Sequence, residues 1–149
     1  FHAQGEAPDP VAEETFNSSK LQWHLKEQGV HKTALEYYKT LIRLRKQLLA
    51  LSHLRRKQMD VTVDEAAQTL LLRRWHSEQQ VVCCMNFSKE EQQINLPDGA
   101  ENWYLMLASA NKEWGGNAVT APTAKGKSNV LLPPESILIY ANLQVKLTF

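Results

Sequence analysis

The sequence predicts a mainly β protein that begins with a helical segment, and three observations predict it. Residues 59–149 contain about seven short apolar runs separated by turn residues, which is typical of an antiparallel β-sandwich. Residues 33–55 repeat apolar side chains with the period of a helix. Residues 1–30 show little regular pattern. We therefore expect two parts, residues 1–57 and residues 58–149.

The first part opens with a predicted short helix. Asp9 is placed to cap a helix whose first residue is Pro10, and Glu13 and Glu14 follow near the positive end of the helix dipole. Three apolar residues come next: Phe16, Leu21 and Trp23. They are too apolar for a free tail, so we expect them to pack on another surface.

A long helix is predicted from about Thr33 to Arg55. Thr33 and Glu36 have the spacing of a capping box. One arc of this helix is polar, and the apolar arc opposite is wide, so we expect more than one neighbour to cover the helix. The apolar arc contains Leu35, Tyr37, Tyr38, Leu41, Ile42, Leu44, Leu48, Leu49 and Leu51.

Arg45 interrupts the apolar arc of this helix. A buried guanidinium group is costly unless it is paired. One interpretation is that the stem of Arg45 lies along the surface and its head reaches water. The other is a fixed pair with a carboxylate or carbonyl at an interface between the helix and the β part.

The predicted strands are Asp60–Asp64, Gln68–His76, Gln80–Phe87, Glu91–Leu96, Trp103–Ala108, Asn129–Leu132 and Ser136–Leu143. The run from Val81 to Met85 is apolar throughout, which indicates a central strand that is covered on both faces. The adjacent Cys83 and Cys84 would point to opposite faces of that strand. Two neighbouring cysteines form neither a relaxed disulfide nor a metal motif, so we expect free buried thiols and a reducing, cytoplasmic location.

Composition excludes several classes of function. A formal net charge of +1 argues against a nucleic-acid surface, and the basic residues between Arg43 and Lys57 are predicted to form a solvated helix face. The sequence has no apolar run long enough for a transmembrane helix and no signal peptide. The chain opens on Phe1 rather than Met, and we expect it to be a piece of a longer protein.

Three stretches resemble proteins of the α-amylase superfamily, glycoside hydrolase family 13. The stretch from Asp9 to Trp23 resembles the segment after the last barrel strand in malto-oligosyltrehalose trehalohydrolases. The run Leu41-Ile42-Arg43-Leu44-Arg45-Lys46 resembles the last barrel helix of the superfamily. Residues 81–88 and 132–140 resemble the middle and final strands of its C-terminal β domain. Residues 109–127 match no pattern of the family, and the paired cysteines depart from it.

The resemblance implies that residues 1–57 are the end of a catalytic (β/α)₈ barrel and that residues 58–149 form the β domain beside it. It also implies a parent enzyme that cleaves the α-1,4 bond next to the trehalose unit of maltooligosyltrehalose, using two carboxyl groups about 5 Å apart. In the family these carboxyl groups lie upstream of Phe1, so no catalytic residue can be assigned here. The nearest partner of the chain would be that upstream barrel.

No independent active site is expected in this chain. Its five His residues have no metal-ligand spacing, Ser18 and Ser19 lack a nucleophile elbow, and no glycine-rich phosphate loop occurs. We therefore predict no catalytic residue, cofactor or metal.

The sequence leaves two functions open and disfavours a third. The first is a structural role, in which the helix exposes apolar side chains that invite self-association when the barrel is absent. The second is a binding module for α-glucans, with Trp114 in a Gly-rich loop as the stacking residue; the alternative is that Trp114 packs within its loop. The third is a free-standing catalyst. Another α-amylase relative, such as a branching enzyme, is an alternative parent.

Overall fold

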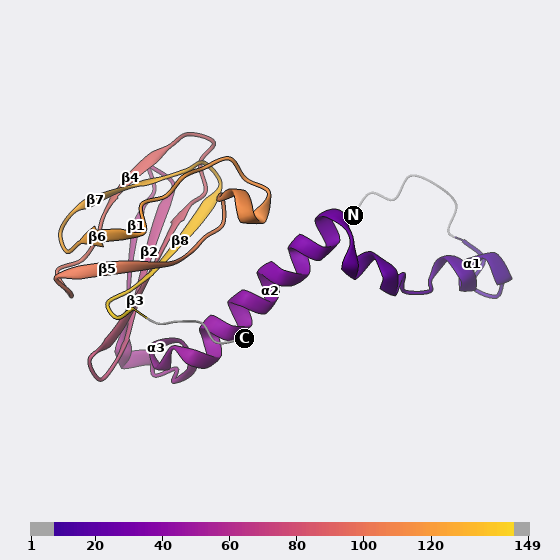
Figure 1. Cartoon of the computed structure of the whole chain (residues 1–149), viewed down its shortest axis with the longest axis horizontal. Helices are drawn as coiled ribbons and strands as arrows, with labels where there is room; N and C mark the ends of the chain where they lie inside the picture. Colours follow the sequence, from indigo (N-terminus) through magenta and orange to yellow (C-terminus); the bar gives the residue numbers. More distant parts are fainter. Residues whose placement is uncertain (1–7, 145–149) are drawn as a thin grey trace.

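The computed structural model describes residues 8–144. Eight strands form two antiparallel sheets, and helices lie at the N-terminal side of the chain (Figure 1). The six-stranded sheet has the order β1-β2-β3-β8-β5-β6, and β4 pairs with β7 in a second sheet. The strands are β1 (Met59–Asp64), β2 (Thr69–His76), β3 (Gln79–Asn86), β4 (Gln92–Asn95), β5 (Asn102–Ala108), β6 (Thr123–Lys125), β7 (Asn129–Leu132) and β8 (Ser136–Ala141).

The six-stranded sheet is covered on both faces. Between it and the small β4–β7 sheet lies a core that includes Val82, Cys84, Trp103, Leu138 and Tyr140. The opposite face packs against the helices. The expected antiparallel β-sandwich with an N-terminal helical segment is therefore confirmed.

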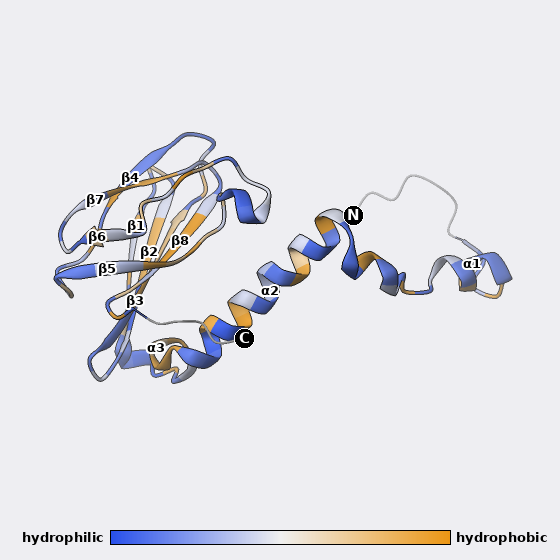
Figure 2. Ribbon diagram, in the orientation of Figure 1, coloured by the Kyte–Doolittle hydropathy of each residue, from blue (hydrophilic) through white to orange (hydrophobic). Residues whose placement is uncertain are grey.

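The helical segment consists of α1 (Glu13–Ser18), η1 (Trp23–Glu27), α2 (Gly29–Gln47), α3 (Leu49–Ser52) and η2 (Arg56–Gln58), and η3 (Lys112–Trp114) lies in the later loop. The C-terminal half of α2 and α3 pack on the sheet, whereas the N-terminal end of α2 points away from it (Figure 1). Apolar residues recur along the whole of α2 and in β2 and β8 (Figure 2).

Two details predicted for the helices are wrong. The long helix begins at Gly29, so Thr33 lies inside it and its hydroxyl donates to the Gly29 carbonyl at 3.4 Å instead of forming a capping box. The helix also stops at Gln47, because Leu48 takes an extended conformation (φ −92°, ψ 110°) with its side chain fully buried. Burial of Leu48 against the sheet outweighs the helical pattern of residues 48–55.

The predicted cap of the first helix is also wrong. The Asp9 carboxylate accepts from the Val11 amide at 3.0 Å, which forms a turn, and α1 starts only at Glu13 after Ala12. Glu13 and Glu14 do lie in its first turn, as expected.

The strand predictions are confirmed within two residues at each end, but β6 was missed. Its three residues lie in the stretch 109–127, which matches no pattern of the family. β3 is central, between β2 and β8, and Cys83 and Cys84 point to opposite faces as expected. The division into residues 1–57 and 58–149 stays a prediction.

Candidate docking surface

One side of α2 packs against the β domain. Tyr37, Leu41 and Leu44 are spaced by three or four residues, so they share one face of the helix, and Leu48 follows directly after its end. Leu44 and Leu48 are at most 1% exposed and contact a cluster that includes Val81. This side of the helix is an ordinary core contact.

The neighbouring side of α2 has no cover among residues 8–144. Tyr38 is 64% exposed and Ile42 is 53% exposed. Arg45 follows at the same helical spacing and is exposed. The wide apolar arc of the sequence is therefore only half covered by residues 8–144.

Two side chains of the sheet hold α3 in place. The side-chain Oε1 of Gln79 accepts from the Ala50 amide at 3.0 Å, and Arg74 Nε donates to the Ala50 carbonyl at 3.0 Å. Both backbone groups of Ala50 are thus satisfied by strands β2 and β3. These contacts fix the short helix at the lower end of the sheet (Figure 1).

A pocket of about 430 Å³ lies where α2, α3 and β2 meet. It is lined by Tyr38, Leu41, Ile42, Arg45, Leu51, Leu54 and Arg74. The lining is apolar except for the tyrosine hydroxyl and the two guanidinium groups. Within the described residues, Arg74 Nη2 is buried and has no hydrogen-bond partner.

The segment before α2 adds further apolar exposure. Phe16, Leu21 and Trp23 are 64%, 73% and 69% exposed. Lys20 and Lys26 lie over the rings of Phe16 and Trp23, at 4.6 and 5.8 Å from the ring centroids. The packing surface expected for the three apolar residues is not supplied by residues 8–144.

Trp114 packs against α2. Its ring lies edge-on to Tyr37 with the centroids 5.1 Å apart, and the side chain is half-buried beside a cavity of about 310 Å³. Part of the indole ring is thus already in contact with α2. Contact of Trp114 with carbohydrate stays a prediction.

Trp103 and Trp75, which both lie on strands, differ in how deeply they are buried. Trp103 is fully buried, and its indole N–H donates to the Pro97 carbonyl at 3.4 Å. Trp75 is only half-buried, with Arg73 over its ring at 5.6 Å.

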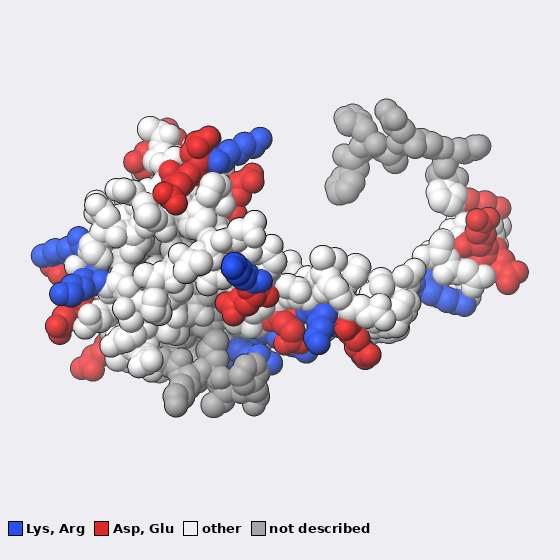
Figure 3. Space-filling view, turned by 45° about the horizontal axis from the view of Figure 1, so that its top comes forward, with Lys and Arg blue, Asp and Glu red and all other residues white. Residues whose placement is uncertain are grey.

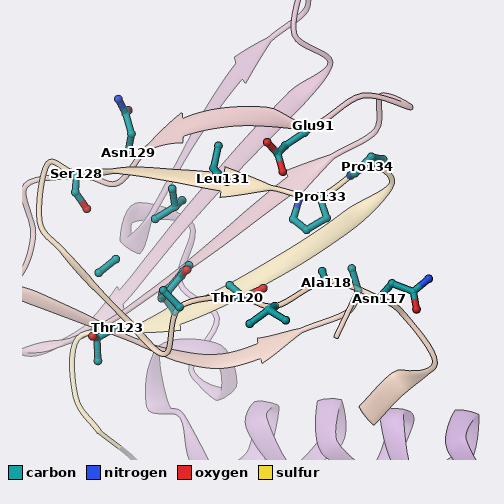
Figure 4. A pocket seen from close by; sticks show the side chains of 16 residues that line it. Glu91, Asn117, Ala118, Thr120, Thr123, Ser128, Asn129, Leu131, Pro133 and Pro134 are labelled. Atoms are coloured by element: carbon teal, nitrogen blue, oxygen red, sulfur yellow. The ribbon is translucent and has the colours of Figure 1, made fainter. Parts of the chain in front are cut away.

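Another groove lies between β7 and the segment 117–123 (Figure 4). It has a volume of about 780 Å³, and Glu91 is the one carboxylate that lines it. Hydroxyl and amide groups add to its polarity; they belong to Asn117, Thr120, Thr123, Ser128, Asn129 and Tyr140. A glycoside hydrolase site of the two-carboxylate type needs a second carboxyl group, so this groove does not fit such a site.

Ionisable groups inside the sheet are kept neutral. Burial raises the pKa of Cys83 to about 11 and that of Cys84 to about 12. Both thiols are free. They behave as small apolar core residues rather than as nucleophiles at neutral pH.

Sequence reasoning pointed to Arg45 but missed Arg74 and Gln79. The structure places Arg45 and Arg74 in one pocket, and the pairing of Arg45 with a carboxylate or carbonyl stays a prediction. The only signal for Arg74 was the pair Arg73-Arg74 after three leucines, which puts one arginine on each face of the strand. Nothing in the sequence shows that Gln79 lies under α3.

Residues 60–142 match the family described as alpha amylase, C-terminal all-beta domain. The chain belongs to this family. The match begins one residue after β1 starts and includes all eight strands, so the whole β part is an α-amylase C-terminal domain. The expected relationship to the α-amylase superfamily is confirmed.

Relatives of this α-amylase C-terminal domain also match part of the helical segment. The malto-oligosyltrehalose trehalohydrolase of Brevibacterium helvolum is 34% identical over 115 residues, which are 77% of this chain and 18% of the relative. The enzyme of that name from Rhizobium sp. (strain M-11) is 37% identical over 102 residues, 68% of this chain and 16% of the relative. The chain thus spans less than a fifth of each relative.

Solved structures show the same fold. Trehalulose synthase MutB from Pseudomonas mesoacidophila MX-45 is similar with a TM-score of 0.51 and 22% identity, over 71% of this chain and 17% of that one. A variant of trehalulose synthase MutB reaches a TM-score of 0.55 at 23% identity, over the same shares of the two chains. These likenesses concern the fold alone.

Proposed function

We propose that the chain is the C-terminal part of a trehalose-releasing glycoside hydrolase and that its own role is structural. Residues 1–57 complete the catalytic barrel, and residues 58–149 form the accessory β domain that packs beside it. The full enzyme hydrolyses the α-1,4 bond next to the trehalose unit of maltooligosyltrehalose, with catalytic carboxyl groups that this chain does not supply. The two trehalohydrolase relatives support this parent over a branching enzyme.

The observation that carries the proposal is the uncovered side of α2. Tyr38 and Ile42 are more than half exposed, and Phe16, Leu21 and Trp23 extend the apolar exposure toward the N-terminus. Large exposed apolar patches mark interaction sites. The catalytic barrel is the neighbour that would cover them, and in its absence the 149-residue chain self-associates.

A charged side chain at Ile42 tests the proposal, because its effect reverses sign with context. In the 149-residue chain, Ile42→Lys adds a cation to an exposed surface, so self-association measured by light scattering falls. In the longer protein with its upstream domain, the same cation is placed in a buried contact, and the stability drops by about 2 kcal/mol or more.

Leu131→Lys is the matched control. Leu131 is 52% exposed, close to the 53% of Ile42, but it lies on β7 in the opposite layer. We expect it to change neither self-association nor the stability of the longer protein. Equal stability of the Ile42→Lys and Leu131→Lys proteins with the upstream domain present would contradict the proposal.

Two finer parts of the proposal have their own tests. Glucan contact at Trp114 predicts a change in tryptophan fluorescence with millimolar maltooligosaccharide, and this change is absent in Trp114→Leu.

A cytoplasmic location is supported by the two free, buried thiols, which suit a reducing compartment. No helix within residues 8–144 is long and apolar enough to cross a membrane.

A further inference from the structure

The junction of the helices with the sheet concentrates positive charge. Residues 43–57 contain six Lys and Arg residues and no Asp or Glu, although the whole chain is nearly balanced at 17 basic and 16 acidic residues. Elsewhere the signs are mixed, as on the face that Figure 3 shows. The basic residues are Arg43, Arg45, Lys46, Arg55, Arg56 and Lys57.

Most of these cations have no acidic partner in the described part of the chain. The ion pairs within residues 8–144 are Glu36–Lys39 and Asp98–Lys127. Arg43 makes an interaction of its own and is set aside. Of the remaining five, Arg45 and Lys46 lie on α2, and Arg55, Arg56 and Lys57 lie at η2 and the residue before it.

The pocket between α2 and α3 shows what these cations face. Arg45 and Arg74 line it together, and its other walls are five aliphatic or aromatic side chains. Arg74 is fixed, because its Nε donates to the Ala50 carbonyl, while Nη2 is buried without a partner among residues 8–144. A guanidinium group in an apolar setting is costly unless an anion pairs with it.

We propose that the surface covering this junction is acidic as well as apolar, and that one of its carboxylates enters the pocket between Arg45 and Arg74. The occupant is a segment of the upstream catalytic domain of the same protein, so the inference rests on the proposed function. A nucleic acid fits less well, because Tyr38, Ile42 and Leu54 bring apolar rather than polar surface to the site.

The test compares charge variants of the longer protein that includes the upstream domain. Arg45→Glu places like charges together, so its thermal midpoint falls by about 2 °C or more, and the neutral Arg45→Gln falls less. Raising NaCl from 0.05 to 1 M shortens the screening length from more than 10 Å to about 3 Å. High salt therefore reduces the difference in thermal midpoint between the Arg45→Glu variant and the unaltered protein.

Lys125→Glu is the control, because Lys125 is exposed on β6 at the opposite edge of the sheet. It makes the same change of net charge and leaves the midpoint of the longer protein unaltered. In the 149-residue chain, Arg45→Glu lowers the midpoint less than in the longer protein, because it only replaces a cation in the last turn of α2 and the acidic partner is missing there.

The outcomes separate this inference from the proposed function. If Ile42→Lys destabilises the longer protein but Arg45→Glu and salt have no effect, the barrel covers the junction without a carboxylate and the inference is wrong. If Arg45→Glu lowers the midpoint of the 149-residue chain equally, the partner lies within this chain and the inference is again wrong. If Ile42→Lys has no effect on the longer protein, the proposed function itself fails.

Discussion

The two faces of the six-stranded sheet differ in how completely the described part of the chain, residues 8–144, covers them. The face toward β4 and β7 is closed, with Trp103, Leu132, Leu138 and Tyr140 at most 1% exposed. The face toward α2 is closed only under the C-terminal half of the helix, and Val61 and Val63 on β1 remain at least half exposed there. One core is thus self-sufficient, whereas the other continues into an open surface.

This difference places the surface available to a partner on the α2 face of the sheet. Register places Val61 opposite Leu72 and Val63 opposite Leu70, on the same face of the sheet as Cys83 and Ile139. That face therefore continues beyond α2 toward β1. The apolar side of α2 and this part of the sheet are both available to one large neighbour.

Removing the largest side chain of the closed core gives the largest expected effect. Trp103→Ala leaves a cavity between the sheets and an unpaired Pro97 carbonyl, so it lowers the free energy of unfolding by about 3–5 kcal/mol. Urea unfolding followed by circular dichroism measures the loss. The loss is the same with or without the upstream domain, because this core is complete in the chain. A loss that doubled in the longer protein would show that the closed core also depends on the partner.

Leu48→Ala tests the half-closed core at its best-covered point. Leu48 is fully buried and breaks the helix to reach the sheet, so the variant loses about 2–4 kcal/mol by urea unfolding. Leu49→Ala is the control. Leu49 is 44% exposed, so its truncation should lower the free energy of unfolding far less. Similar losses at the two positions would mean that the helix is not packed on the sheet in solution.

The sequence predicted the closed core better than the half-closed one, for a physical reason. Alternation and turn residues locate strands because each strand is governed by local pattern, so seven of the eight were found. The strand β6 was missed because Thr123, Ala124 and Lys125 are too few to show alternation. The end of α2 was missed because residues 48–51 are mostly apolar in sequence, and only the sheet below decides that Leu48 turns inward.

The candidate site was predicted in part. Arg45 stood out because a charge interrupted an apolar arc, which is a local signal. Arg74 and Gln79 became part of the site only because α3 folds onto β2 and β3, and no local pattern contains that contact. The acidic partner proposed for this surface is not among residues 8–144, so no pattern within them could indicate it.

High pH should weaken the sheet through its thiols, which face the two cores. Cys83 and Cys84 have pKa values raised to about 11 and about 12, whereas the unfolded chain titrates near 9.0. Above pH 9 the unfolded state loses protons first, so stability is constant below that pH and falls as the pH rises toward 11–12. The slope is about 1.4 kcal/mol per pH unit for each thiol.

Urea unfolding between pH 8 and 10.5 measures this slope. In Cys83→Ala/Cys84→Ala the baseline stability is lower, but its decline above pH 9 is shallower. Tyr140 contributes a smaller residual decline beginning near pH 10, since burial raises its pKa to about 12. An equally steep decline in the double variant would exclude the thiols as its source.

The smallest expected effect concerns the contact that joins α3 to the sheet. Gln79→Leu removes the acceptor of the Ala50 amide, so α3 loses about 1 kcal/mol of stabilisation. Gln79→Glu keeps a carbonyl-type oxygen at that position and places it on the same side of the sheet as Arg74, so it loses less. Hydrogen exchange at the Ala50 amide reports the change directly, because local opening of α3 exposes that group. Unchanged protection of Ala50 in Gln79→Leu would mean that burial of Leu48 alone holds α3 on the sheet.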